Sequence, residues 1–146
     1  MKKQKRVWIS LLLSIILIVV LSGCSGLPKT AKINISISPN PVPYNSETGE
    51  WLFNVIFSES NGVGVTLTSI RFDAYDQAEE LVNTQILDEE EITDWFESNY
   101  LPAFSALSSW IFHTSTTIIY DILTVAGVDD NGNPIEATER VDYLPK

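Results

Sequence analysis

Cysteine and histidine each occur only once in this sequence, as Cys24 and His113. A single cysteine excludes a disulfide within the chain. One cysteine and one histidine are also too few to form the usual zinc ligand sets. Nucleophilic catalysis needs a base beside the nucleophile. The sequence therefore leaves one catalytic triad possible, formed by His113, Ser115 and an aspartate. No nucleophile-elbow pattern surrounds Ser115, and we expect His113 to lie in solvent at a strand end. We therefore predict a protein that is not an enzyme and holds no metal or cofactor.

Basic residues are also few. Four of the nine lysines and arginines lie in the first six positions, so residues 24–146 keep five against 19 acidic residues, a formal charge of −14. Such a charge repels nucleic acid and other polyanions, and we expect no nucleic-acid partner. Aromatic and β-branched residues are dense throughout, which excludes intrinsic disorder.

The longest apolar run lies close to the N-terminus. It covers residues 7–21, is interrupted only by Ser10 and Ser14, and follows a cationic segment at residues 2–6. A cationic head, a short apolar stretch and then small residues are the parts of a secretory signal. The run is shorter than the roughly 20 apolar residues of a membrane-spanning helix. Export therefore fits this segment better than a permanent membrane span.

The apolar run ends in Leu21-Ser22-Gly23-Cys24, which resembles the lipobox of bacterial lipoproteins. The resemblance implies that residues 1–23 are removed and that Cys24 carries a diacylglycerol thioether, often with an added N-acyl chain such as palmitate. Two acyl chains give stable membrane attachment. We expect a lipid-anchored protein on the exported face of the cell membrane or outer membrane. Residues 24–32 then form the lipidated N-terminus and a short tether, whose residues 25–32 reach at most about 26–29 Å.

Period-two alternation of apolar residues predicts strands through most of residues 33–146. The clearest case is residues 51–58, where one face is entirely aromatic or aliphatic. A turn follows at residues 59–62, and the apolar phase then shifts by one near Thr68-Ser69, which predicts a β-bulge. Further strands are expected at about residues 32–38, 63–72, 80–87, 105–112, 117–126 and 135–143.

Residues 88–100 show a different pattern. Asp88 and Glu91 have the spacing of a capping box, and acidic residues 89–91 suit the positive end of a helix dipole. Pro102 follows as a stop signal. We predict one short helix near residues 88–100, inserted among the strands, with one face formed by Ile92, Trp95, Phe96 and Tyr100.

Six or seven strands and one short helix predict a mainly β domain at residues 33–146, built as a single antiparallel β-sandwich. Residues 35–41, 62–67 and 125–132 resemble segments of the immunoglobulin-like or fibronectin III-like domains of bacterial surface lipoproteins. The resemblance implies adhesion, scaffolding or ligand presentation, and it carries no catalytic residues. The immunoglobulin disulfide is absent, and the helical insert departs from a minimal sandwich.

Oxygen-bearing side chains concentrate in residues 129–133, at Asp129, Asp130, Asn131 and Asn133. Calcium prefers such ligands, but the spacing does not match an EF-hand loop. A hairpin turn through Asn131-Gly132 explains the same residues without an ion. The acidic residues 88–91 leave a similar choice open, between binding a cation and capping the start of a helix. We predict a hairpin and a helix start, with no metal at either.

Two functions remain open for the exported domain. The first is a non-enzymatic structural or protein-interaction role in the cell envelope, with other envelope proteins or a surface ligand as partners. The alternative is a carbohydrate- or peptide-binding module. Its binding patch would be the aromatic cluster around the helix, formed by Trp95, Phe96, Tyr100 and Trp110, with Phe104 beside them.

Overall fold

A computed structural model describes residues 29–114 and 117–146. The signal segment, Cys24 and Ser115 lie outside the described residues, so the predictions for them stay predictions. Within the described ranges, no helix has the length and hydrophobicity to cross a bilayer.

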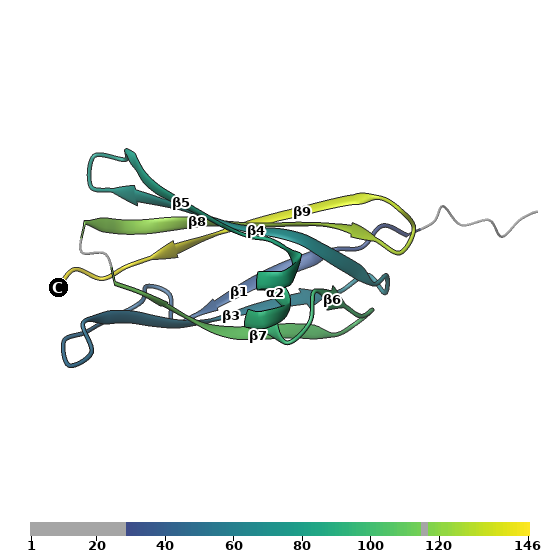
Figure 1. Ribbon diagram of the computed structural model, residues 1–146, viewed down its shortest axis with the longest axis horizontal. Helices are drawn as coiled ribbons and strands as arrows, with labels where there is room; N and C mark the ends of the chain where they lie inside the picture. The colour runs from purple at the N-terminus through teal and green to yellow at the C-terminus, as the bar shows by residue number, and fades with distance from the viewer. Residues whose placement is uncertain (1–28, 115–116) are drawn as a thin grey trace, which may run out of the picture.

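Two antiparallel sheets face each other, as Figure 1 shows. In the first sheet, β3 (Glu50–Glu59) pairs on one side with β1 (Ile33–Ser38) and β2 (Tyr44–Asn45), and on the other with β7 (Ala106–His113). The strands of the second sheet are β4 (Val65–Asp76), β5 (Leu81–Leu87), β6 (Tyr100–Leu101), β8 (Ile118–Asp129) and β9 (Pro134–Asp142). Their order is β5-β4-β8-β9, with β6 paired to the start of β4. The predicted β-sandwich is confirmed.

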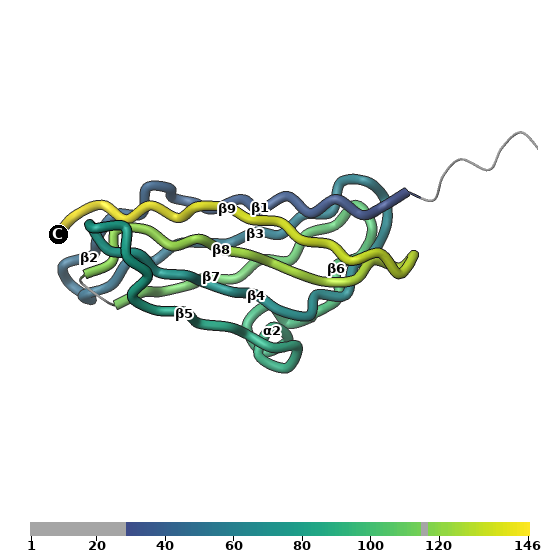
Figure 2. The backbone as a smooth tube through the Cα atoms, turned by 90° about the horizontal axis from the view of Figure 1, so that it is seen from above, coloured from purple at the N-terminus to yellow at the C-terminus, as the bar shows by residue number. Residues whose placement is uncertain are grey.

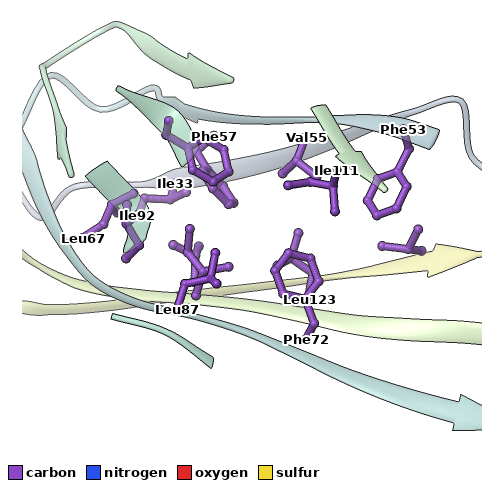
Figure 3. Close-up of a cluster of buried hydrophobic side chains, with 14 of the residues drawn as sticks. Ile33, Phe53, Val55, Phe57, Leu67, Phe72, Leu87, Ile92, Ile111 and Leu123 are labelled. Carbon is purple, nitrogen blue, oxygen red and sulfur yellow. The ribbon is translucent and has the colours of Figure 1, made fainter. Parts of the chain in front are cut away.

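The core lies between the inner faces of the two sheets (Figure 3). The alternation predicted for residues 51–58 is confirmed, since residues 51, 53, 55 and 57 are buried and the residues between them are not. Glu59, which was predicted to begin the turn, instead continues β3 and is buried as well. The predicted bulge is confirmed by a register shift between Leu67 and Ser69 against β8. The extra residue lets both Leu67 and Ile70 point inward, and burying each such side chain stabilises the fold by about 1.5–3 kcal/mol.

The inserted helix α2 (Glu89–Phe96) begins as predicted. Asp88 accepts hydrogen bonds from the backbone of Glu90 and Glu91, and the Glu91 side chain completes the capping box. The helix ends earlier than expected, because Glu97 adopts a left-handed conformation with φ 65°. Tyr100 is therefore not on the helix but in β6.

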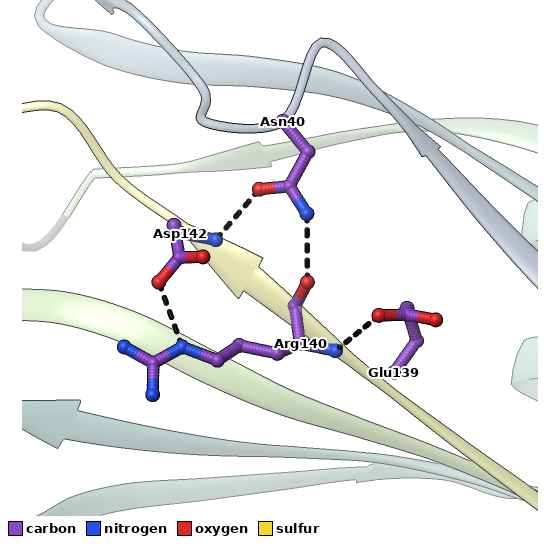
Figure 4. A network of polar contacts seen from close by, with 4 residues as sticks. All are labelled: Asn40, Glu139, Arg140 and Asp142. Carbon is purple, nitrogen blue, oxygen red and sulfur yellow. Dashed lines mark hydrogen bonds and ion pairs between the residues drawn. The ribbon is translucent and has the colours of Figure 1, made fainter.

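One side of the sandwich is closed where the chain crosses from β1 to β2. The side-chain amide of Asn40 donates to the carbonyl of Arg140 at 2.8 Å and accepts from the backbone N–H of Asp142 at 2.9 Å (Figure 4). Asn40 thus pairs with the edge of β9 as a neighbouring strand would. Beside it, Val42 forms a parallel bridge with Tyr143. Covering a sheet edge in this way prevents unwanted strand addition.

The opposite side, between β5 and β7, is more open. Figure 2 shows α2 following β5 on this side, about midway along the sandwich. Six of the seven residues of β5 are exposed, and only Leu87 is buried. The functional groups described next lie along this side and at the end where the chain enters.

Candidate functional site

A small cavity opens between the sheets on the β5–β7 side; we call it the side cavity. Its volume is about 30 Å³, which suits one or two water-sized guests and is far below that of a drug-sized site. Its polar wall is formed by Asn83, Gln85, His113, Asp121 and Tyr143, and its apolar lining includes Phe53, Phe72, Ala74, Trp95 and Ile111.

Three titratable side chains meet in the side cavity. The Tyr143 hydroxyl donates to Oδ2 of Asp121 at 2.7 Å, and the His113 ring stacks on the Tyr143 ring with centroids 5.5 Å apart. Asp121 Oδ1 and His113 Nε2 are both buried and have no hydrogen-bond partner among the described residues. Two polar atoms without partners in a closed space are rare in folded proteins and mark this cavity as unusual.

Burial sets the charge of this group. It raises the pKa of Asp121 to about 6, despite the opposing hydrogen bond from Tyr143, and the nearby Asp73 charge adds to the rise. Burial and the Asp121 charge raise the pKa of Tyr143, and burial lowers the pKa of His113. At neutral pH the cavity therefore holds a carboxylate, a phenol that donates to it, and a neutral imidazole.

His113 does not lie in solvent, contrary to the sequence prediction. It is half-buried between the rings of Trp51 and Tyr143, because β7 extends as far as this residue and turns it toward the core side. Ser115, the nucleophile of the considered triad, lies outside the described residues. The aspartate in the same cavity is Asp121.

The predicted aromatic cluster is not a single patch. Phe96 is only 3% exposed and packs on Phe57 at 5.1 Å between ring centroids, so it belongs to the core. Trp95, one residue earlier on the helix, lines the side cavity. Tyr100 donates from its hydroxyl to Asp130 at 3.1 Å in another part of the molecule. The error arose from assigning Tyr100 to the helix face.

Trp110 lies on the outer face of the first sheet with a neighbour that sequence reasoning missed. Trp110 and Phe112 are each 62% exposed and point the same way along β7, and Leu52 lies opposite Phe112 on β3. We call these three residues the β7 outer patch. The signal was available, since alternation in residues 106–113 puts the two aromatic residues on one face and Ile111 on the other.

A second organised region lies where the chain enters the domain. This N-terminal end of the sandwich consists of the β3–β4 turn (residues 60–64), the β6–β7 loop (102–105) and the β8–β9 turn (130–133) (Figure 1). Each of residues 29–32 forms a backbone hydrogen bond with a side chain of this end. The Asn131 side chain donates to the carbonyl of Lys29 at 2.7 Å, and Asn61 donates to that of Thr30 at 2.7 Å. Residues 29–32, which the sequence assigned to the short tether, are therefore bound to the folded domain.

Two buried carboxylates complete this attachment. Asp129 accepts from the backbone N–H of Ala31 at 3.1 Å, and Glu59 accepts from that of Lys32 at 3.1 Å. Glu59 also accepts backbone N–H groups of Asn61, Gly62 and Phe104. Burial alone would raise the pKa of Glu59, but these four donors outweigh it and lower the pKa to about 2.

The same arrangement bears on the calcium alternative. Burial would raise the pKa of Asp129, but donors from Asn133, Ala31 and Asn131 lower it. Its oxygens thus face N–H hydrogens, which repel a cation, while Asp130 accepts from Tyr100. Among the described residues, no three His, Cys, Asp or Glu side chains gather as a metal site would require. The turn chemistry accounts for residues 129–133.

A scan of the sequence against protein-family models and a search of curated proteins both find no match. Among solved structures, the chain is similar to a protein from Bordetella pertussis assigned as ApaA, at 13% identity over 81% of this chain and 98% of that one, with a TM-score of 0.43. It is also similar to the CARDB domain of PF1109 from Pyrococcus furiosus, solved with di-metal ions, at 16% identity over 80% and 90%, with a TM-score of 0.42. Likenesses this remote transfer no ligand and no activity to this chain.

Proposed function

We propose that this protein is a lipid-anchored lipoprotein of the bacterial cell envelope whose β-sandwich serves a non-enzymatic, protein-interaction role. The observation that carries the proposal is the continuity between the lipobox and the fold. Cys24 stands five positions before Lys29, whose carbonyl accepts a hydrogen bond from Asn131 at the N-terminal end of the sandwich. A lipid on Cys24 would therefore hold one defined end of the domain at the membrane.

The position of the far end of the sandwich supports the proposed protein-interaction role. The C-terminus lies at the end opposite the entering chain (Figure 1), so both long faces and the far end would project away from an anchoring bilayer. The side cavity is too small for a sugar or a peptide. A partner of that size would therefore bind outside the side cavity.

The β7 outer patch favours a protein segment as that partner. Exposed aromatic residues are enriched at the centres of protein interfaces. Among the described residues, strand β7 pairs with β3 alone, and it carries no Asp, Glu, Lys, Arg or Pro among Ala106–His113. Such an edge accepts an added strand, with the patch supplying side-chain contacts. A carbohydrate that stacks on Trp110 is the second candidate for the same surface.

The anchor is tested by metabolic labelling with palmitate and detergent phase partitioning in a bacterial host. The wild-type chain should incorporate the label and enter the detergent phase. Cys24→Ala should incorporate none and should remain a larger, uncleaved precursor, whereas the control Ser25→Ala should behave as wild type. Mature wild-type protein recovered unlabelled in the aqueous phase would contradict the proposal.

The interaction role is tested by photo-crosslinking in intact cells. A crosslinker at Ser108, on the outer face of β7, should give a discrete protein adduct that Trp110→Ser abolishes. The same crosslinker at Ser46, in the turn at the far end, is the matched control and should give no such adduct. Adducts of equal yield at both positions would argue against a binding patch on β7.

A further inference from the structure

The fastening of residues 29–32 limits how far the domain can rise from its anchor. Lys29 is five positions after Cys24, and a fully extended chain covers about 3.6 Å per position, so their span is at most about 18 Å. The N-terminal end of the sandwich must then stay within about 18 Å of the lipidated residue if Cys24 carries the anchor, close enough for side chains at this end to reach the lipid headgroups.

Phe104 is the most exposed of the large apolar side chains at this end. Its ring is 73% exposed, while Leu101 in the preceding strand is fully buried. Its backbone is left-handed with φ 55°, a conformation that bulky residues rarely adopt. Glu59 stabilises this conformation by accepting the Phe104 N–H at 3.1 Å. A buried carboxylate thus holds a strained residue in place, and its exposed phenyl group lies over the β3–β4 turn.

The turn beneath the ring is shaped to fit it. Gly62 has φ 82°, and a Cβ atom there would come within 2.5 Å of the Phe104 ring. The same Glu59 carboxylate accepts the Gly62 N–H at 2.8 Å. One carboxylate therefore orders both the turn and the loop, so that the ring's direction is determined by the fold and not by a free loop.

We propose that Phe104 inserts into the interfacial layer of the bilayer to which Cys24 is anchored and so sets the orientation of the domain on the membrane. The proposal rests on the lipid anchor proposed above. Aromatic side chains favour the boundary between headgroups and acyl chains. The overall charge of −14 in residues 24–146 gives no attraction to anionic lipid, so the contact is apolar. We therefore expect it on zwitterionic phosphatidylcholine, and no more strongly on anionic vesicles.

The test places a nitroxide label on the lipidated full-length protein in phosphatidylcholine vesicles. Cys24 is the only cysteine and its sulfur is consumed by the lipid, so Ala103→Cys offers a single labelling site beside an intact Phe104. This label should collide more with dissolved oxygen and several-fold less with a water-soluble nickel complex than a label at Ser46→Cys. Ser46 is exposed and lies in the turn between β2 and β3, at the far end.

Substitutions at position 104 separate insertion from folding. Phe104→Asn removes the phenyl group but tolerates a left-handed backbone, so the loop should persist. It should reduce the ratio of inserted to uninserted molecules on the order of tenfold, the value of one buried phenyl group. Phe104→Trp should retain insertion. The proposal is overturned if the label at residue 103 is as water-accessible as that at residue 46, or unaffected by Phe104→Asn, while the protein floats with the vesicles. If the protein does not float with the vesicles, Cys24 carries no lipid anchor, and the orientation proposal fails with the anchor proposal.

Discussion

The hydroxyl of Tyr143 donates a 2.7 Å hydrogen bond to Asp121, a carboxylate that is only 4% exposed at the wall of the side cavity. The contact joins the chain after β9 to the middle of the second sheet. It satisfies one carboxylate oxygen and leaves the other, Oδ1, without a partner among the described residues. An incompletely satisfied buried carboxylate favours its neutral form, and this has a measurable effect on stability.

We predict that Asp121 makes the fold less stable as pH rises from about 4 to 6. Its pKa is about 6 in the folded protein against an ordinary value of 3.8, so the folded state binds the proton more tightly. The stability that protonation contributes is fully present below the lower pKa and is lost as pH rises through the higher one, about 3 kcal/mol in all. Asp121→Asn, measured by urea denaturation at several pH values, should remove this slope.

The control for that experiment is Asp94→Asn, which changes an exposed aspartate on α2. It should keep the wild-type pH dependence between pH 4 and 6. Parallel curves for the wild type and Asp121→Asn would show that Asp121 ionises freely in the folded state.

Glu59 should show the opposite pH dependence. Its pKa is lowered from the ordinary 4.5 to about 2, so the stability that its carboxylate contributes is present above pH 4.5 and is lost as pH falls through 2. Glu59→Gln cannot accept all four backbone N–H groups and should cost roughly 2–3 kcal/mol at pH 7. Thermal unfolding of this variant against Glu136→Gln, an exposed site with the same charge change, measures the effect. Equal melting temperatures for the two variants would contradict the role of Glu59.

Gly127→Ala should destabilise the fold by overpacking. A Cβ atom at Gly127 would clash with the backbone carbonyl of Thr66 on β4, where no side chain can move aside. Overpacking of this kind typically costs about 1–3 kcal/mol. Gly132→Asn is the contrasting variant, because no atom lies within 4 Å of the added Cβ and asparagine tolerates its φ of 82°. If the Gly127→Ala protein is as stable as Gly132→Asn in chemical denaturation, the backbones at Gly127 and Thr66 do not lie as close together as we describe.

Calcium should not raise the melting temperature selectively. The Asp129 oxygens already accept N–H groups of Ala31, Asn131 and Asn133, and a cation would have to displace these donors. We expect calcium and magnesium to give the same small response at constant ionic strength, as a diffuse acidic surface would. A rise of several degrees with calcium alone, abolished by Asp130→Asn, would establish a specific site.

The sequence by itself determined the features that depend on neighbouring residues. The inward face of β3, the bulge after Leu67, the capping box at Asp88 and the turn before Pro134 all follow from patterns a few residues long. Each is confirmed because its physical cause, side-chain alternation or a local hydrogen bond, acts within the same segment. The helix end was misplaced because the left-handed conformation of Glu97 carries no such pattern.

The tertiary structure alone decided which polar groups meet. Glu59 and Phe104 are 45 residues apart, and Asp129 and Ala31 are 98 apart, so no short pattern relates them. Period-two alternation does hint that Glu59 points inward, since it continues the series of residues 53, 55 and 57. It cannot say what satisfies the buried charge. That depends on which turns the packed sheets bring together, because a buried carboxylate is tolerated only where other segments supply donors.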